Sequence, residues 1–537
     1  MEFLDFYIEP FYQYFPFFLL YAELHFRFKY FGSRYFQKVP EINADTPFRI
    51  EPGESLPIYL LIKDAHIFPI RLDSVHIVIS QNKEKVKSLN HKVGIHIEKP
   101  WWEELIEIPT EGLIGEHTIE VHFTYSCNGE MKSCITHNYP QSKIHFLSTN
   151  ISKHTYPRKN KVQYGDLHYH TNLTDDMVEF GASIPASARA SAAMGLDFFC
   201  TTDHSYDLDD KEGSWTETDP DLHKWNDSRR QIKQENKINK NVLIIPSEEL
   251  SLHNTKGQNV HALILNSPTF LPGAGDGGEK LFDFSAEFTT STVHEQLEDT
   301  ALCIAAHPYN HIPLIQRKLF KRGIWGEKDV NQDNLAGLQI LNGMDDKDFR
   351  RGMSKWRKLL LNGFKKYIYA GNDAHGNFNI FRQIKTPFFS LREARQQIFG
   401  VCRTGVIDSK KNNIHSVIQS MKKGNCFITN GAYLNMTILN SGKSFAMGSS
   451  IPHRKGEIYL DILSSEEFGN IRNVKLIRGI IGEKKEKVIF QYDKLHSCQM
   501  QEIISVTAES ESYFRCEVML ENGGYAFSNP IWMHPKN

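Results

Sequence analysis

The sequence has little of what marks several classes of protein. Its 537 residues hold only eight cysteines and no C-x-x-C pair, so neither a disulfide-dense scaffold nor a thiolate zinc site is expected. The formal net charge of −2 gives no electrostatic reason to expect a nucleic-acid partner. There is no G-x-S-x-G nucleophile elbow, and the glycine-rich "LPGAGDGGEK" lacks the Lys-Ser/Thr of a phosphate-binding loop.

The aromatic N-terminus also lacks the marks of a secretory signal or a membrane span. It has no basic start and carries Glu2, Asp5 and Glu9. Its longest uncharged run, residues 10–22, contains two prolines and is too short to cross a bilayer. We therefore expect a cytoplasmic protein without a transmembrane segment. Packing on the next domain or on a second subunit is favoured for this segment, while contact of residues 1–30 with a membrane surface stays open.

What the chain does contain is three blocks with different strand and helix patterns. After an aromatic segment, 1–47, short strands separated by turns predict a β-sandwich over 48–150. The basic, polar stretch 151–163 is a linker. From 164 to 431 apolar strands alternate with helical stretches, which predicts a parallel sheet, either closed into a barrel or open and doubly wound. Strands return over 432–537 and predict a second β-sandwich.

Polar side chains follow the apolar strands of the middle block. The stretch "YGDLHYHTNLTDD" puts two histidines on one face of a strand and two carboxylates in the loop behind it. Ligands in parallel α/β folds gather at the carboxyl ends of the strands, so we expect these groups to converge. They are His168, His170, Asp203, His204, Glu248, Glu249, His261, His307, Asp373 and His375.

A single histidine at a strand end is more often a hydrogen-bonded structural residue than a ligand. Six strand ends that all supply His, Asp or Glu are hard to explain in that way, because burying so many titratable groups costs heavily without a cation. Imidazoles and carboxylates without thiolate suit Zn²⁺, Mn²⁺ or Fe²⁺. The sequence therefore predicts a metal site in the middle block.

Six short motifs in order resemble those of the polymerase and histidinol phosphatase (PHP) metallohydrolases: "DLHYHT", "TTDH", "PSEELS", "HALIL", "AAHP" and "GNDAH". The segments "LQILNG", "GNDAHGNFNIFRQ", "KKGNCFITNG" and "YAFSNPIW" resemble the carbaryl-hydrolase and amide-hydrolase (CehA/McbA) branch more closely. The resemblance implies an α/β fold with a distorted (β/α)7 barrel that is flanked by all-β, sandwich-like domains. It also implies two or three divalent ions.

Carried over residue by residue, the resemblance gives three metal sites. The first takes His168, His170, Glu249 and Asp373, and the second takes Glu249, His261 and His307. The third takes His204, His375 and a carboxylate from "TDD", either Asp175 or Asp176, of which we favour Asp175. Around these ligands, His307 or His375 is the candidate proton shuttle, and Asp203 is the residue that orients an imidazole. Arg382 either binds a substrate anion or stays in solvent, and the sequence favours neither.

This site predicts a metal-dependent hydrolase in which metal-bound hydroxide cleaves a small ester, amide or carbamate-like bond. A phosphoesterase acting on a phosphodiester, a phosphomonoester or a nucleic-acid 3′ end is the alternative. A non-catalytic binding or scaffold protein is the third hypothesis, disfavoured because no ligand position is empty. The expected partner is a small-molecule substrate rather than nucleic acid, and self-association stays open.

Overall fold

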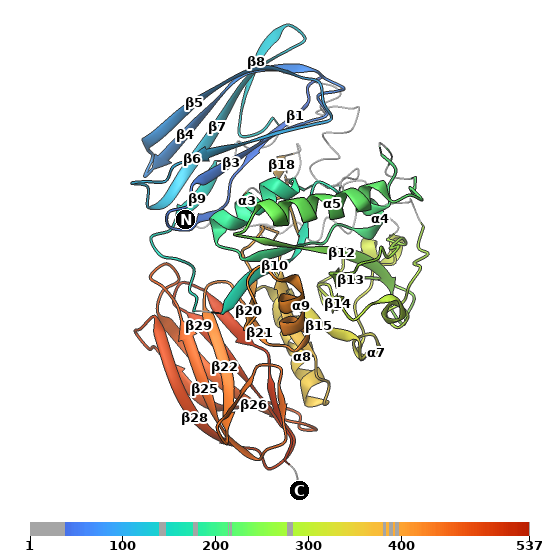
Figure 1. Cartoon of the computed structure of the whole chain (residues 1–537), viewed down its shortest axis with the longest axis vertical. Coiled ribbons are helices and arrows are strands. Elements are labelled where there is room, and N and C mark those ends of the chain that lie inside the picture. The colour runs from blue at the N-terminus through green and yellow to red at the C-terminus, as the bar shows by residue number, and fades with distance from the viewer. Residues whose placement is uncertain are drawn as a thin grey trace.

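The computed structural model describes residues 38–138, 146–159, 161–174, 181–212, 214, 217–276, 283–379, 383–385, 390–392 and 397–535. Three bodies follow one another along the chain, and the middle one carries the candidate site (Figure 1). The aromatic segment 1–37 lies outside the described residues, so its expected packing and membrane contact stay predictions. Within the described part, no helix is both long and apolar enough to cross a membrane.

The N-terminal body consists of two packed sheets. Strand β7 alternates buried with less buried residues, because one face of its sheet is turned to the other sheet. The smaller sheet has the order β1-β3-β6, and the larger has β2-β9-β7-β4-β5 with β8 on β7. The strands are β1 Glu41–Asp45, β2 Arg49–Ile50, β3 Leu56–Lys63, β4 Ile70–Gln81, β5 Glu84–Ile97, β6 Trp101–Ile108, β7 Gly115–Cys127, β8 Glu130–Ile135 and β9 Leu147–Ile151.

The middle body is a curled sheet with the order β16-β15-β14-β13-β12-β11-β10-β20-β21. Its strands are almost wholly buried, as expected for apolar runs with few alternating polar residues. They are β10 Val162–His170, β11 Phe198–Thr201, β12 Leu243–His253, β13 Asn259–Leu265, β14 Leu302–Ala305, β15 Leu335–Asn342, β16 Tyr367–Gly371, β20 Arg403–Ile407 and β21 Cys426–Thr429, with the short β17 Ala374–His375 paired to β10. Strands β18 Gln383–Lys385 and β19 Ser390–Arg392 form a separate two-stranded sheet.

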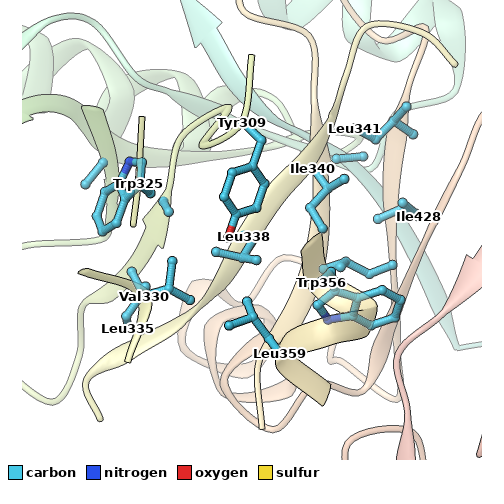
Figure 2. Packing of buried hydrophobic residues seen from close by; sticks show 14 of the residues in the cluster. Tyr309, Trp325, Val330, Leu335, Leu338, Ile340, Leu341, Trp356, Leu359 and Ile428 are labelled. Carbon is cyan, nitrogen blue, oxygen red and sulfur yellow. The ribbon is translucent and has the colours of Figure 1, made fainter. Parts of the chain in front are cut away.

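Helices cover parts of this sheet. Helix α3 begins at the N-cap Ser183, whose side chain accepts a hydrogen bond from Ala186 N, and ends at Gly195 in the left-handed region (φ +73°). Trp356 of α8 packs with Leu338 and Ile340 of β15 in the apolar cluster shown in Figure 2. The helices are α3 Ile184–Met194, α4 Ser205–Leu208, α5 His223–Ile238, α6 Leu314–Leu319, α7 Glu327–Val330, α8 Lys347–Leu361, α9 Ile414–Lys422 and the 3₁₀ helix η2 Val293–Gln296.

The C-terminal body continues the middle sheet. Strand β30 pairs with β21, and β29, β26 and β27 follow, while β23-β22-β25-β28 form a second layer. The apolar residues of the two layers share one cluster. The strands are β22 Tyr433–Asn440, β23 Lys443–Ala446, β24 Ser450–Ile451, β25 Lys455–Leu463, β26 Ile471–Ile480, β27 Lys487–Asp493, β28 Gln499–Thr507, β29 Ser512–Leu520, β30 Tyr525–Ser528 and β31 Ile531–Met533.

The predicted α/β class with a distorted (β/α)7 barrel is wrong, and with it the barrel fold that the PHP resemblance implies. Of the residues that the structure describes, 45% lie in strands and 15% in helices, and the middle sheet is a curled half-barrel. Strand β12 pairs antiparallel with β13, β13 with β14, and β10 with β20, so the sheet is mixed rather than parallel. Between β13 and β14, the stretch "VHEQLEDT" contains only the short 3₁₀ helix η2. Apolar runs predict strands, but they do not fix the direction in which the strands pair.

Candidate metal centre

The centre lies where several strands of the middle sheet end. His168 and His170 are at the end of β10, and their Nε2 atoms are 3.1 Å apart, because alternate residues of a strand share a face. Glu249 lies within β12 and His261 within β13. The remaining four described members follow strand ends or lie on the short β17; they are His204, His307, Asp373 and His375. The structure thus brings together eight of the predicted ligand residues.

The carboxylate of Glu249 is at the middle of this cluster. Its Oε1 lies 2.8 Å from Nδ1 of His261 and 3.1 Å from Nε2 of His307. Its Oε2 lies 3.1 Å from Nδ1 of His204, 3.2 Å from Nε2 of His168 and 3.4 Å from Nε2 of His170. Five imidazoles therefore surround one buried carboxylate.

Asp373 supplies the second carboxylate. Its Oδ1 lies 3.2 Å from Nε2 of His168 and 3.4 Å from Nε2 of His170. Asp373 has φ +54° and His307 has φ +28°, both in the left-handed region that non-glycine residues rarely adopt. Backbone strain of this kind gathers at functional sites, where the surrounding structure holds it.

Within the centre, three groups of ligand atoms lie close enough to hold an ion. They are His168, Glu249, His307 and Asp373; His204, Glu249 and His261; and His170, His204 and His375. These groups share residues with the three predicted sets but divide them differently, since His170 joins His204 and His375, and His307 joins His168 and Asp373.

The donor atoms fit divalent cations. With metal–ligand bonds of about 2.0–2.2 Å, two ligands of one ion lie roughly 3.0–3.5 Å apart, and the imidazole–carboxylate distances in the centre are 3.1–3.4 Å for His168, His170 and His204. The Nε2 atoms of His168 and His170 are 3.1 Å apart, which lies in the same range. Nitrogen and oxygen donors without sulfur suit Zn²⁺, Mn²⁺ or Fe²⁺.

The charges of the centre reinforce one another. Burial raises the pKa of Glu249, but His261, His168 and His204 lower it more, to well below the usual range. Asp373 has a pKa well below its usual value too, because His168 and His170 outweigh burial. Burial lowers the pKa of His168, but Asp373 and Glu249 raise it to a net value of about 9. The pKa of His170 is lowered by burial and by His375 and His204.

Some predicted site residues do not join the centre directly. Asp203 accepts hydrogen bonds from the backbone N of Thr171 (2.6 Å) and from Oγ1 of Thr174 (3.1 Å), and this Oγ1 is 3.2 Å from Nδ1 of His170. Asp203 therefore reaches an imidazole through Thr174. Glu248 instead accepts hydrogen bonds from Trp225 and Arg229 at 2.8 Å each. Asp175, Asp176 and Arg382 lie outside the described residues, and their assigned roles stay predictions.

Two residues with clear contacts were missed from the sequence. Oε1 of Gln339, in β15, lies 2.9 Å from Nδ1 of His168, and its Nε2 donates to Asn342 Oδ1 at 3.0 Å. Nη1 of Arg322 lies 2.7 Å from Nε2 of His261. Gln339 could have been found as a polar residue inside an otherwise apolar strand. Arg322 belongs to no strand, and no sequence pattern links it to His261.

A cavity of about 140 Å³ opens beside the centre. His261, His307 and Arg322 form its polar side, and its other lining residues are Asn259, Val260, Ala306, Pro308, Asn310, His311, Ile312, Gln316, Gly323, Ile324 and Trp325. Arg322 is held in place by Asp276, 2.7 Å from its Nη2. A small molecule bound here would lie against two candidate ligands of the centre.

Comparisons with known proteins place the chain in no family. No family model matches it, and no curated protein matches it. Among solved structures, similarity is found to a cycloisomaltooligosaccharide glucanotransferase from Paenibacillus sp. (10% identity, TM-score 0.20) and to a glycosyl hydrolase family 2 member from Bacteroides cellulosilyticus (9%, 0.16). A beta-glucuronidase from Bacteroides uniformis is similar at 8% identity and TM-score 0.19.

These alignments cover 91%, 92% and 92% of this chain and 69%, 63% and 61% of the respective proteins. Their TM-scores are too low to support an argument about fold or chemistry. The identification as a PHP metallohydrolase of the CehA/McbA branch is nevertheless wrong, because the mostly-β fold described above lacks the (β/α) barrel and no family model matches. The TIM-barrel-like, PHP-type phosphoesterase description that goes with this family is wrong with it.

Proposed function

We propose that the protein is a metal-dependent hydrolase that uses water to cleave a small ester, amide or carbamate-like bond. The observation that carries the proposal is the carboxylate of Glu249, buried at the contact of five imidazoles. A carboxylate that bridges histidine groups suits two or three divalent ions of Zn²⁺, Mn²⁺ or Fe²⁺. Such ions, when bound, lower the pKa of water toward neutrality and stabilise negative charge in the transition state.

The residues of the chain have separate roles in this proposal. His168, His170, His204, Glu249, His261, His307, Asp373 and His375 hold the ions. Oε1 of Gln339 contacts Nδ1 of His168 and so fixes the orientation of this ring. Oγ1 of Thr174 contacts Nδ1 of His170 in the same way. Partners of this kind set which ring nitrogen faces the metal.

The cavity beside His261 and His307 binds the substrate. Its volume of about 140 Å³ compares with the roughly 150 Å³ of a cavity that holds one benzene ring, so it accommodates a ring-sized part of a molecule. Arg322 and Asn310 offer hydrogen bonds on its wall, and Ile312, Ile324 and Trp325 offer apolar contacts. The bond to be cleaved would lie at the edge shared with the two histidines.

Water is the nucleophile in this proposal because the described residues offer no activated side-chain nucleophile. Cys200 and Cys303 lie in the buried strands β11 and β14. Burial raises the pKa of both thiols, that of Cys303 to about 12, so neither is a thiolate at neutral pH.

Hydrolysis of a glycosidic bond by two carboxyl groups is disfavoured. That reaction needs one carboxylic acid with a raised pKa to protonate the leaving group. The pKa values of both Glu249 and Asp373 are shifted well below their usual range. Neither can serve as that acid, so the charge pattern favours cations over a carboxylate pair.

The test combines metal analysis with a substrate screen. We expect at least two transition-metal ions per purified chain, and turnover of an ester, amide or carbamate by the metal-loaded protein. The screen includes phosphomonoester, phosphodiester and glycoside substrates as competing outcomes. His168→Ala should abolish turnover, whereas His415→Ala, an exposed histidine of α9, should not change it. Metal content below about half an ion per chain after growth with Mn²⁺, Fe²⁺ and Zn²⁺ would refute the proposal and favour a binding or scaffold protein.

The cysteines support the cytoplasmic location that we propose. All eight are free, and six of them are buried. Reduced thiols are typical of proteins in a reducing compartment.

A further inference from the structure

The segment that follows His375 is bound by the N-terminal body. Three residues after His375, the backbone N of Phe378 donates to Oδ2 of Asp45 at 2.8 Å. The carbonyl of Phe378 accepts from the backbone N of Phe48 at 3.0 Å. Asp45 is the last residue of β1 and is buried. Asp45 and Phe48 of the N-terminal body thus hydrogen-bond to both backbone groups of Phe378 in the middle body. Phe378 lies three residues after the candidate ligand His375.

The side chains of this segment make the same connection. The ring of Phe378 is buried and lies edge-on to Tyr59 of β3, with ring centroids 6.2 Å apart. Next along the chain, Nδ2 of Asn379 donates to the carbonyl of Ser148 in β9 at 2.6 Å. Between His375 and these contacts, Gly376 has φ +65°, and a Cβ there would collide with the backbone of Ala182. The turn leaves the segment little freedom to shift.

The apolar core supports this arrangement. One buried cluster contains Tyr59 and Leu61 of the N-terminal body together with Tyr169, Ala374 and Phe378 of the middle body. Tyr169 lies between His168 and His170, and Ala374 lies between Asp373 and His375. The N-terminal body therefore packs on the opposite side of the two backbone stretches that carry four candidate ligands.

We infer that the N-terminal β body is part of the metal-binding apparatus, with Asp45 as a positioning residue that holds His375 in place through the backbone of Phe378. This inference rests on the proposed metal centre. Residues that orient a ligand typically change metal affinity by about 10–100-fold when they are replaced. Asp45 acts through the backbone rather than on the imidazole, so the effect should be confined to the group formed by His170, His204 and His375.

The experiment titrates the full-length, metal-free protein with Co²⁺ and follows the visible absorption bands of the bound ion. His375→Ala first identifies the binding step that belongs to this group. Asp45→Ala should weaken the same step by about 10-fold or more and leave the other steps within about twofold. Asp45→Asn, which keeps an acceptor oxygen, should retain most of the affinity. The matched control is Glu107→Ala, which removes an ion pair of the N-terminal body to Arg189 of α3 (2.6 Å) away from His375.

The possible results distinguish a failure of this inference from a failure of the proposed metal centre. Combining Asp45→Ala with His375→Ala should weaken Co²⁺ binding no further than His375→Ala alone, because both changes act on one group. A folded Asp45→Ala protein with an unchanged binding step would overturn the inference. If that variant does not fold, Asn379→Ala decides, because Asn379 is only half-buried: a several-fold weakening of the same step supports the inference, and no change overturns it. A wild-type protein that binds no Co²⁺ refutes the metal centre itself.

Discussion

Nη1 of Arg322 lies 2.7 Å from Nε2 of His261, and Nδ1 of the same ring lies 2.8 Å from Glu249. A guanidinium can only donate, so Nε2 of His261 accepts the hydrogen bond from Arg322 while Nδ1 faces the carboxylate. One imidazole thus links the cation in the cavity wall to the carboxylate at the middle of the centre. Binding at either place should affect the other.

Replacing this cation should therefore change metal affinity. In Arg322→Met a positive charge next to the centre is lost, and the carboxylate of Asp276 is left without its partner. Both effects favour a bound cation, so we expect Zn²⁺ to bind about tenfold more tightly, measured by competition with a chromophoric chelator. Arg317→Met, an exposed arginine of α6, should leave the affinity unchanged. Weaker Zn²⁺ binding by Arg322→Met would contradict the electrostatic argument.

Gln339 should be needed for a stable ring orientation of His168. Gln339→Leu removes the acceptor at 2.9 Å from Nδ1 and leaves a buried N–H without its partner. We expect metal affinity to fall by about 10–100-fold while the far-ultraviolet circular dichroism is retained. Gln339→Glu, which keeps an acceptor oxygen, should lose less. Equal losses in both variants would indicate a packing defect rather than lost orientation.

Removing metal should destabilise the protein. A ligand that binds only the folded state adds RT ln(1 + [L]/Kd), about 4 kcal/mol at a concentration of 1,000 Kd. Dialysis against a chelator should therefore lower the melting midpoint by several degrees, and adding Zn²⁺ or Mn²⁺ back should restore it. The same treatment should have much less effect on Glu249→Ala, which lacks the shared carboxylate. An identical shift in the two proteins would show that the stabilising ion binds elsewhere.

The ion pair between the N-terminal and C-terminal bodies should contribute strongly to stability. Nε and Nη2 of Arg49 donate to the two oxygens of Glu467 at 2.7 and 2.9 Å, and Arg49 is only 3% exposed. Breaking such a buried pair costs about 3 kcal/mol when the remaining charge has no other partner. Arg49 also pairs with Glu51 at 2.6 Å, so Arg49→Met should lower the melting midpoint more than Glu467→Gln does. The double variant should melt close to Arg49→Met, and additive losses would mean that the two residues act independently.

Lys366 gives the fold a pH-dependent component. Its ammonium donates to the carbonyls of Gln332 and Leu335, and burial lowers its pKa from 10.5 to about 8. Between about pH 8 and 10.5 the unfolded chain binds more protons at this lysine than the folded chain, so its contribution to stability rises with pH. We expect the melting midpoint of the wild type to rise relative to that of Lys366→Met between pH 8 and 10. A constant difference would exclude this linkage.

The sequence predicted the residues of the centre better than the fold around it. His168 and His170 share a face because the side chains of a strand alternate. The order of the motifs was enough to predict that Glu249 and Asp373 lie next to them, as the structure has it. The pairing directions of β12, β13 and β14 could not be predicted, because an apolar run reads the same in a parallel and an antiparallel sheet. The barrel prediction failed for this reason.

The contacts between the three bodies could not be predicted from the sequence either. The polar stretch "SKHTYPRKNK" predicts an N-terminal domain that separates more readily than the C-terminal one. The contacts of Asp45 with Phe378 and of Arg49 with Glu467 hold the N-terminal body to the rest of the chain, so we expect it to separate less readily than this stretch predicts. Each of these contacts joins residues more than 300 positions apart, and no local sequence pattern predicts such a pair.

The strand order of the sheet that carries His168 and His170 determines when this sheet can assemble during synthesis of the chain. Strand β10 pairs with β20, which pairs with β21, and β21 pairs with β30 at the end of the 537-residue chain. At synthesis rates of about 5–20 residues per second, β30 emerges roughly 20–70 s after β10. Until then the sheet ends in an open edge on the ribosome, the kind of surface that invites wrong pairing and chaperone binding. A nascent chain interrupted before residue 525 would carry every candidate ligand and still lack the strand that pairs with β21.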